Sequence, residues 1–154
     1  MPQFRTKRRV RHAAADMFDL VADMEHYPEF VPLCQDMRVR KRTATGEGIE
    51  TVVAEMTVAY KILRETFTSR VTLDRSNLQI LVEYLNGPFS RMENRWDFHP
   101  AGEQLCDVEF FISYEFKSRV FAMLMGAMFD TAFRRFSLAF ERRADVVYGR
   151  PKSA

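Results

Sequence analysis

Apolar residues recur with helical spacing along the last long segment of the chain, residues 118–143. At about 100° per residue they fall within one arc of roughly 140°. The members of this arc are Phe121, Ala122, Met125, Met128, Phe129, Ala132, Phe133, Phe136, Ala139 and Phe140. The opposite, polar side carries Asp130, Arg134, Ser137 and Glu141. The pattern predicts an amphipathic helix of about 39 Å, which needs a wide apolar surface beneath it.

The ends of this helix also have sequence signals. Ser118 is suited to the N-cap, because its hydroxyl can accept a hydrogen bond from a free backbone N–H of the first turn. Gly149 and Pro151 mark where the helix must stop.

Alternation of apolar and polar residues predicts strands over most of the remaining chain. The first covers about residues 3–11, with Phe4, Thr6, Arg8 and Val10 on one face. The other strands are expected at about 35–42, 49–60, 62–73, 79–85, 91–99 and 104–116. Turns are expected at 45–48, 86–88 and 100–102, where glycine and proline gather.

Two short pieces separate the first strand from the second. Residues 16–24 have a helical pattern, which should end before Tyr27-Pro28 because a residue that precedes proline disfavours the α conformation. Residues 27–34 hold two prolines that frame Phe30 and Val31, and we expect a stiff turn or a single helical turn.

The predicted element order gives an α+β fold, with a curved antiparallel sheet of about seven strands around the long C-terminal helix. The connections between the last six strands are of hairpin length, which makes neighbouring strands antiparallel. Each strand offers one apolar face, and a single long apolar helix can cover them. We expect one domain at 1–150 with a short tail at 151–154, because no repeat or linker interrupts the chain.

Composition agrees with a compact domain that has large, adaptable core side chains. The chain has 154 residues, 47% of them hydrophobic, with 14 Phe and 9 Met. A formal net charge of +2 does not by itself predict a polyanionic partner. Cys34 and Cys106 are far apart and form no paired motif, and no apolar run has the length of a membrane span. We expect a soluble, cytoplasmic protein.

The sequence carries no catalytic, metal-binding or cofactor motif. Its histidines, His12, His26 and His99, are scattered and none has metal-site spacing. Cys34 near His26 could form a nucleophile and base, but we favour a buried structural thiol. Trp96 is either core or pocket lining. Asn94 lies on an apolar strand face and therefore needs a hydrogen-bond partner. The partner is either water or a neighbouring backbone group, or it is the head group of a ligand.

The first strand has a strongly basic outer face with Arg5, Lys7, Arg9 and Arg11, which Arg38, Arg40, Lys41 and Arg42 could extend. Two interpretations remain open. The basic side chains pair across strands with Asp107, Glu109 and Glu115, if the first and last strands adjoin. Alternatively they form a surface for ribosomal RNA or anionic lipid.

The helix arc also leaves room for a ligand. Ala122, Ala132 and Ala139 interrupt its bulky residues, and Phe30-Val31 could form a movable lid. A tunnel of this kind suits an elongated apolar ligand. The alternative is a core that is filled by side chains.

Several segments together resemble a known family. They are residues 27–32 (Tyr-Pro-Glu-Phe-Val-Pro) with Cys34, 67–71 (Phe-Thr-Ser-Arg-Val), 87–89 leading to 95–98, 106–110, 114–118, and 139–143 through 148–149. This set resembles the coenzyme Q-binding, START-like family, whose bacterial branch includes ribosome association toxins. Leu33 departs from the family pattern, in which a tryptophan usually follows the second proline.

The resemblance implies a helix-grip fold with a cavity between sheet and helix. It implies ubiquinone or a related polyprenyl lipid as ligand, and a non-catalytic chaperone role that supports respiration, with no other cofactor and no metal. Possible partners are the membrane surface, respiratory complexes and the large ribosomal subunit, with a cytoplasmic location or a peripheral one at the inner membrane face. The residues we expect to line the ligand site are Tyr27, Phe30, Val31, Met56, Phe67, Asn94, Trp96, Val108, Phe110, Ile112, Phe121, Met125, Met128, Phe129 and Ala132.

Two other functions stay open. One is a ribosome-binding regulator of subunit association that uses the basic outer strands. The other is an enzyme like the polyketide cyclases of the wider superfamily, for which Tyr60, Tyr114 and Asn94 are the weakly placed candidates for a polar catalytic group.

Overall fold

Seven antiparallel strands form one sheet in the order β1-β7-β6-β5-β4-β3-β2. The computed structural model describes residues 3–60 and 62–149. The strands are β1 (Gln3–Val10), β2 (Cys34–Gly46), β3 (Ile49–Tyr60), β4 (Leu63–Asp74), β5 (Gln79–Asn86), β6 (Phe89–Gly102) and β7 (Leu105–Phe116). The helices are α1 (Ala14–Ala22), the 3₁₀ helix η1 (Met24–Glu29) and α2 (Arg119–Tyr148).

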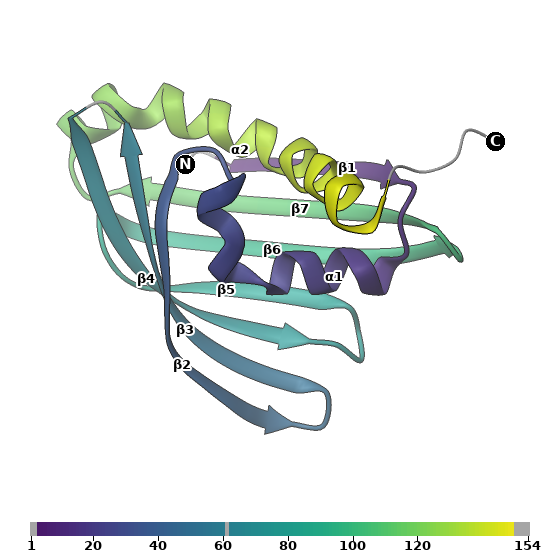
Figure 1. The fold of residues 1–154 in the computed structure, drawn as a ribbon. Helices are drawn as coiled ribbons and strands as arrows, with labels where there is room; N and C mark the ends of the chain where they lie inside the picture. Colours follow the sequence, from purple (N-terminus) through teal and green to yellow (C-terminus); the bar gives the residue numbers. More distant parts are fainter. Residues whose placement is uncertain (1–2, 61, 150–154) are drawn as a thin grey trace.

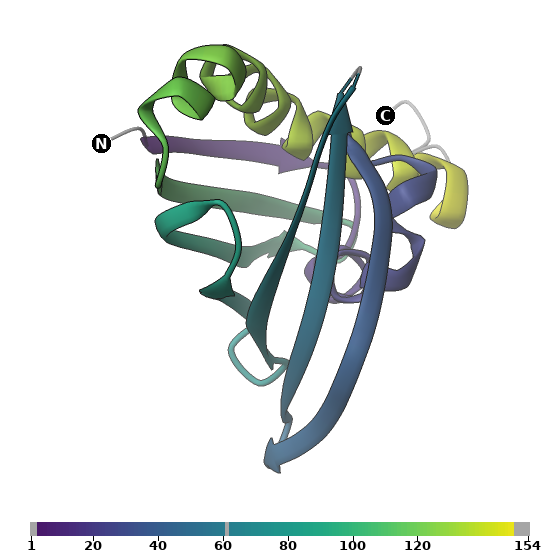
Figure 2. The ribbon, with the colours of Figure 1, turned by 90° about the vertical axis from the view of Figure 1, so that its left-hand side faces the viewer.

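The sheet is strongly curved. Strands β2 to β4 turn away from the direction of β1, β7 and β6, as Figures 1 and 2 show from two sides. The β2–β3 pairing shifts register three times, between Cys34 and Asp36, Val39 and Lys41, and Ala44 and Gly46. Such irregularities bend a strand and increase its twist. The predicted fold, a curved antiparallel sheet around a long C-terminal helix, is therefore confirmed.

The helix α2 lies along β1 and β7 on the side of the sheet that also carries α1 and η1 (Figure 1). It has 30 residues, or about 45 Å. Aromatic side chains of α2 pack edge-to-face against aromatic side chains of the sheet. Phe140 meets Trp96 with ring centroids 5.0 Å apart, and Phe133 meets Tyr114 at 5.2 Å. Contacts of this geometry add to the energy of area burial.

The predicted helix ends are largely confirmed. The Ser118 hydroxyl accepts a hydrogen bond from the Phe121 N–H at 3.1 Å, and the helix ends before Gly149. It therefore continues past 143, and Pro151 lies outside the described residues. Ser137 was expected on the polar side but is buried, as are Phe133, Phe140 and Ala144. The buried stripe rotates along the axis because the C-terminal half of α2 also packs against α1 and β1.

Two other boundaries differ from the prediction. β6 runs to Gly102, so the turn expected at 100–102 falls at 103–104. Pro100 is tolerated there because the pairing of β5 with β6 ends at Asp97, leaving the proline nitrogen without a strand on that side. The helical pattern also continues as η1 through Pro28, in the tighter 3₁₀ form, after α1 ends at Ala22.

Within the described residues, no helix combines the length and the apolar character needed to cross a bilayer.

Candidate functional site

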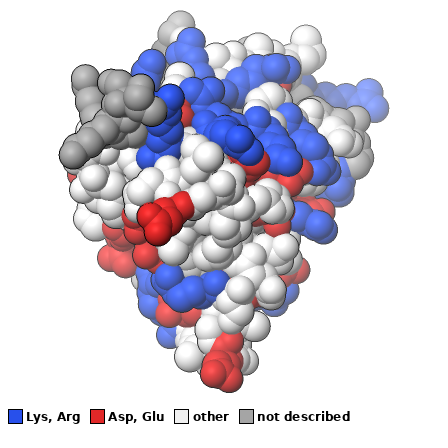
Figure 3. All heavy atoms as spheres, turned by 90° about the vertical axis from the view of Figure 1, so that its right-hand side faces the viewer, with Lys and Arg blue, Asp and Glu red and all other residues white. Residues whose placement is uncertain are grey.

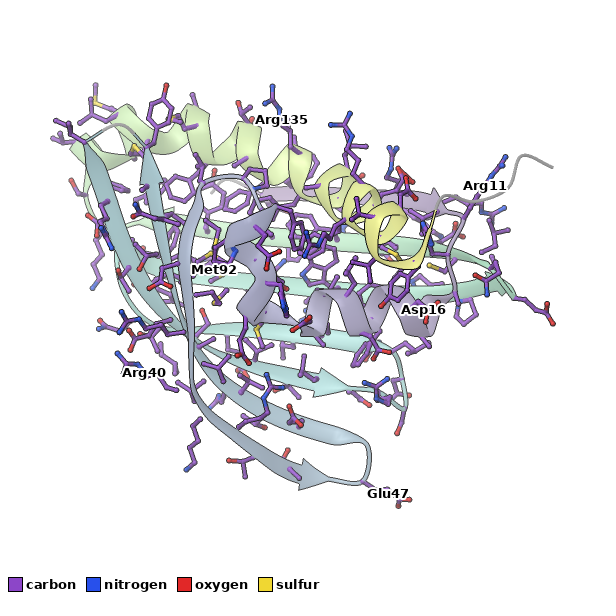
Figure 4. The ribbon with its side chains drawn as sticks, in the orientation of Figure 1. Arg11, Asp16, Arg40, Glu47, Met92 and Arg135 are labelled. Atoms are coloured by element: carbon purple, nitrogen blue, oxygen red, sulfur yellow. The ribbon has the colours of Figure 1, made fainter. Side chains whose placement is uncertain are left out.

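An apolar cavity of about 90 Å³ lies between α2 and the concave face of the sheet. Side chains from α1, from η1, from the segment that follows it, from β2 to β7 and from α2 form its wall. Met92 from β6 is one of them and points into the space between sheet and helices (Figure 4). Pockets for drug-sized ligands have volumes of about 300–1,000 Å³. In this conformation the core is therefore nearly filled, and a larger ligand requires side chains or a helix to move.

The structure brings many of the predicted site residues together. Those that line the cavity are Tyr27, Val31, Met56, Phe67, Asn94, Trp96, Ile112, Phe129 and Ala132. They come from η1, the following segment, four strands and the middle of α2. Ligand contact by these residues stays a prediction.

The other predicted residues lie outside the cavity wall. Val108, Phe110 and Met125 are buried elsewhere in the core, Phe121 packs on Phe116, Met128 is partly buried, and Phe30 lies on the outside of α2 against Phe140. The helix arc identifies which face of α2 is apolar, but the cavity occupies only the middle of that face. The periodicity of the sequence does not predict where along the helix axis the cavity lies.

Sequence reasoning missed a further group of lining residues. These are Val21, Met24, Pro32, Leu33, Met37, Ala54, Val58, Ser69, Val71, Ile80, Val82, Phe89, Met92, Phe133, Phe136 and Phe140. Several of them share an inward strand face or the helix arc with residues that were chosen, so the same signal could have found them. Ser69 is the informative case, because it lies between Phe67 and Val71 on the inward face of β4.

The Ser69 hydroxyl is a polar atom of the cavity wall that has no hydrogen-bond partner among the described residues. Its oxygen is buried, and the residue as a whole is 5% exposed. A buried hydroxyl without a partner costs about 1–3 kcal/mol. Ser69 is therefore suited to a hydrogen bond with a polar group of a bound molecule.

Asn94, by contrast, has hydrogen-bond partners for both its amide nitrogen and its amide oxygen. Its Nδ2 donates to the Phe111 carbonyl at 2.8 Å, and its Oδ1 accepts from Trp96 Nε1 at 3.2 Å. Of the two explanations left open for this residue, the structure supports a backbone partner. These bonds also fix the indole of Trp96 against the cavity.

The titratable groups near the cavity are held in their neutral forms. Tyr27 donates its hydroxyl hydrogen to the Val21 carbonyl, and burial raises its pKa above the ordinary value. Burial raises the pKa of the Cys34 thiol to about 11. The His26 ring pairs instead with Asp23, with Nδ1 2.7 Å from the carboxylate. No contact joins His26 to Cys34 among the described residues, so a thiolate–imidazole pair has no structural support.

The basic outer faces of β1 and β2 are largely paired with acids. Arg9 makes two hydrogen bonds to Asp107, at 2.9 and 3.1 Å, and Arg5 reaches Glu109 at 3.4 Å. The bonded guanidinium of Arg9 lowers the pKa of Asp107 below its ordinary value. On β2, Arg38, Arg40 and Arg42 pair with Asp36, Glu55 and Glu50. The pairing interpretation of the first strand holds for Asp107 and Glu109; no such pair involving Glu115 is seen among the described residues.

A different basic surface lies along the C-terminal half of α2. An outer groove runs between this helix and the segment at Phe30 and Pro32; its other lining residues are Arg135, Leu138, Ala139, Arg142, Arg143 and Val146. Arg143 donates to Glu29 at 2.9 Å, whereas Arg135 and Arg142 make no ion pair within the described part of the chain. Arg135 projects away from the body of the molecule (Figure 4), and Lys and Arg atoms gather along the upper part of the face in Figure 3.

Comparison with known proteins places this architecture among its relatives. The family model described as "Polyketide cyclase / dehydrase and lipid transport" matches residues 10–141. The ribosome association toxin RatA of Escherichia coli (strain K12) is 31% identical over 152 residues, covering 96% of this chain and 90% of the relative. The mitochondrial coenzyme Q-binding protein COQ10 homolog B of Xenopus laevis is 30% identical over 138 residues, covering 87% of this chain and 54% of the relative.

A solved structure also has a similar fold over nearly the whole chain. The solution structure of the 18 kDa protein CC1736 from Caulobacter crescentus superimposes with a TM-score of 0.78 at 35% identity. The match covers 97% of this chain and 100% of that protein.

Proposed function

This chain belongs to the polyketide cyclase / dehydrase and lipid transport family, and from that premise we propose that it binds and chaperones a prenylated quinone, ubiquinone or a related polyprenyl lipid. The observation that carries this proposal is the apolar cavity, whose wall includes the buried Ser69 hydroxyl, without a hydrogen-bond partner in the described part of the chain. The name of the Xenopus laevis relative, a coenzyme Q-binding protein, supports the choice of ligand. In the cell this activity would support respiratory electron transport through transient contact with the membrane or with respiratory complexes.

The lining suits a ligand with a long apolar tail and a small polar head. Each buried methylene contributes roughly 0.8 kcal/mol, so a few isoprene units supply most of the binding energy. A quinone carbonyl that accepts a hydrogen bond from Ser69 adds about 1 kcal/mol and sets the orientation of the head group. The apolar walls would contact the tail, and the hydrogen bond from Ser69 would fix the position of the quinone ring.

Space for the ligand must come from movement, because the existing cavity is small. Four methionines, Met24, Met37, Met56 and Met92, form part of its wall. Methionine is unbranched and flexible, so it can repack around a ligand at low cost.

The geometry of α2 also favours opening at one end. Within the described residues, the side-chain polar contacts from α2 to the other elements lie in its C-terminal half, through Glu141, Arg143, Asp145 and Tyr148. The N-terminal half is held to the sheet mainly by apolar and aromatic contacts, such as those of Phe121 and Phe129. Entry beneath the N-terminal half therefore breaks the fewest specific bonds.

The cavity wall supports binding rather than acid–base catalysis. Tyr27 is the one titratable residue in the described wall, and its hydroxyl hydrogen is already donated. The cyclase-like alternative needs a group that exchanges a proton with substrate. Its candidates are poorly placed, because Tyr60 and Tyr114 are not part of the wall, and the amide nitrogen and oxygen of Asn94 already bond to protein groups.

Lipid analysis of the purified protein tests the proposed function. Organic extracts of protein made in a quinone-producing host should contain quinone at a substantial fraction of the protein concentration by mass spectrometry. Delipidated protein should bind added ubiquinone in a saturable titration, whereas a water-soluble quinone without a prenyl tail should bind far more weakly. An extract without quinone, together with a flat titration, would exclude the proposal.

A second candidate function has its own observation. The Escherichia coli relative is named for ribosome association, and the groove along α2 presents Arg135 and Arg142 without acidic partners in the described structure. Unpaired arginines suit a phosphate backbone, so this groove is the surface we assign to contact with the large ribosomal subunit.

A further inference from the structure

The first turns of α2 expose large apolar side chains to solvent. Val120 is 66% exposed, Met123 85% and Leu124 64%. Ile62, in the connection from β3 to β4, is 98% exposed. Exposed apolar residues are ordinary when they are scattered singly, but a group of this size at one place marks an interaction site.

These residues lie at one end of the molecule on two separate projections. The β3–β4 connection and the start of α2 share the left-hand end in Figure 1. Figure 2, which looks onto that end, shows the ends of β3 and β4 and the start of α2 in its upper part. We call the two projections together, with Ile62, Val120, Met123 and Leu124, the apolar end.

Positive charge accompanies the apolar end. Lys117 and Arg119 flank the start of α2, are exposed, and make no ion pair within the part of the chain that the structure describes. No acidic residue occurs from Lys117 to Phe129, and the first one, Asp130, is paired with Arg134. Arg64 is likewise exposed beside the β3–β4 connection.

Projecting apolar side chains with a cationic border match the surface of an anionic bilayer. Apolar groups enter the boundary between head groups and acyl chains, and Lys and Arg stay at the level of the phosphates. We propose that the apolar end docks this protein onto an anionic phospholipid membrane.

Docking by this end also orients the cavity. Met56 and Val58, near the end of β3, and Phe129 and Ala132, on α2, all line it. These are the two elements that carry the apolar end, so the cavity lies between the parts that would touch the lipid. This consequence rests on the proposed function, whereas the docking itself does not depend on which molecule the cavity holds.

Vesicle flotation with delipidated protein tests the proposal. Wild-type protein should float with vesicles of phosphatidylcholine containing roughly 30% phosphatidylglycerol, and less with pure phosphatidylcholine. The double variant Met123→Ser, Leu124→Ser should bind about tenfold more weakly or not at all. The variant Lys117→Gln, Arg119→Gln should lose the preference for the anionic vesicles.

The other end of α2 supplies a matched control. Val146 and Val147 are 76% and 51% exposed, so Val146→Ser, Val147→Ser removes comparable apolar surface and should leave flotation unchanged. Circular dichroism checks folding, and light scattering checks whether the serine pair at 123–124 changes the oligomeric state. The proposal would be overturned if Met123→Ser, Leu124→Ser floats like wild type, or if wild type does not bind the vesicles. It would also be overturned if wild type is a dimer that this double variant disrupts.

The same variants separate this proposal from the proposed function. Quinone titration in detergent should give wild-type affinity for Met123→Ser, Leu124→Ser, because neither residue is part of the cavity wall. A protein that floats but takes up no quinone would refute the ligand and keep the docking surface. A protein that binds quinone but does not float would support the ligand and refute the docking surface.

Discussion

Two serine hydroxyls are buried without a hydrogen-bond partner in the described structure, and only one of them borders the cavity. Ser69 lines the cavity, whereas Ser137 is buried on α2 outside its wall. The sequence directed attention to Asn94 instead, because an amide on an apolar strand face is conspicuous. Its partners depend on the β6–β7 register, which places Asn94 opposite Ile112 and beside the Phe111 carbonyl. These hydrogen bonds depend on the register of β6 against β7, which the alternation of apolar and polar residues does not specify.

Replacing Ser69 by alanine should separate ligand binding from stability. Loss of an unpartnered hydroxyl should leave the free energy of unfolding of the delipidated protein unchanged or raise it by up to about 1 kcal/mol. The affinity for ubiquinone should fall about fivefold, corresponding to one lost hydrogen bond. Thermal unfolding and quinone titration measure the two effects.

Ser137→Ala is the matched control for this substitution. It removes the same kind of buried hydroxyl, so it should have the same small effect on stability and none on quinone affinity. Equal affinities of both variants and wild type would show that Ser69 does not contact the head group.

At the scale of elements, the sequence was informative about α2 and less so about where the cavity lies. Ser118 and Gly149 specify the ends of the helix, and the arc specifies its apolar face. The rotation that buries Ser137 and Ala144 arises from packing on α1 and β1, which a single wheel does not represent. The end of β6 was missed because a proline ends a strand only where another strand lies on the side of its nitrogen, and β5 no longer pairs with β6 at Pro100.

Ala132 and Ala144 allow the cavity beneath α2 to be tested within one element. Both are buried, but only Ala132 lines the cavity. Ala132→Leu should fill free volume, retain the stability of the delipidated protein and lower quinone affinity at least about tenfold. Ala144→Leu has no space to fill and should lower the free energy of unfolding by about 1–3 kcal/mol from overpacking.

Thermal unfolding of delipidated proteins and quinone titration again give the readouts. If Ala132→Leu is as unstable as Ala144→Leu and still binds quinone, then the ligand does not occupy the volume beneath the middle of α2.

At the scale of the whole molecule, the element order and the family resemblance both predicted the architecture, whereas the pairing of charged side chains could not be predicted from the sequence. The basic first strand appeared in the sequence as a possible docking surface. Its acids lie about a hundred residues away on β7, and the register sets Arg9 opposite Asp107 and Lys7 opposite Glu109. Arg135 and Arg142, which make no ion pair among the described residues, lie instead on the helix whose periodicity was interpreted only for its apolar face.

The apolar end and the arginine groove lie on different halves of α2, so their functions can be separated by mutation. Arg135→Glu, Arg142→Glu should weaken co-sedimentation with large ribosomal subunits and reduce the slope of log affinity against log salt by roughly 1–2, because up to two phosphate contacts are lost. The same variant should float with anionic vesicles as wild type does, since neither arginine belongs to the apolar end. Met123→Ser, Leu124→Ser should show the opposite pattern. If the charge-reversed protein sediments with ribosomal subunits like wild type, or wild type does not sediment at all, then the groove is not a ribosome-binding surface.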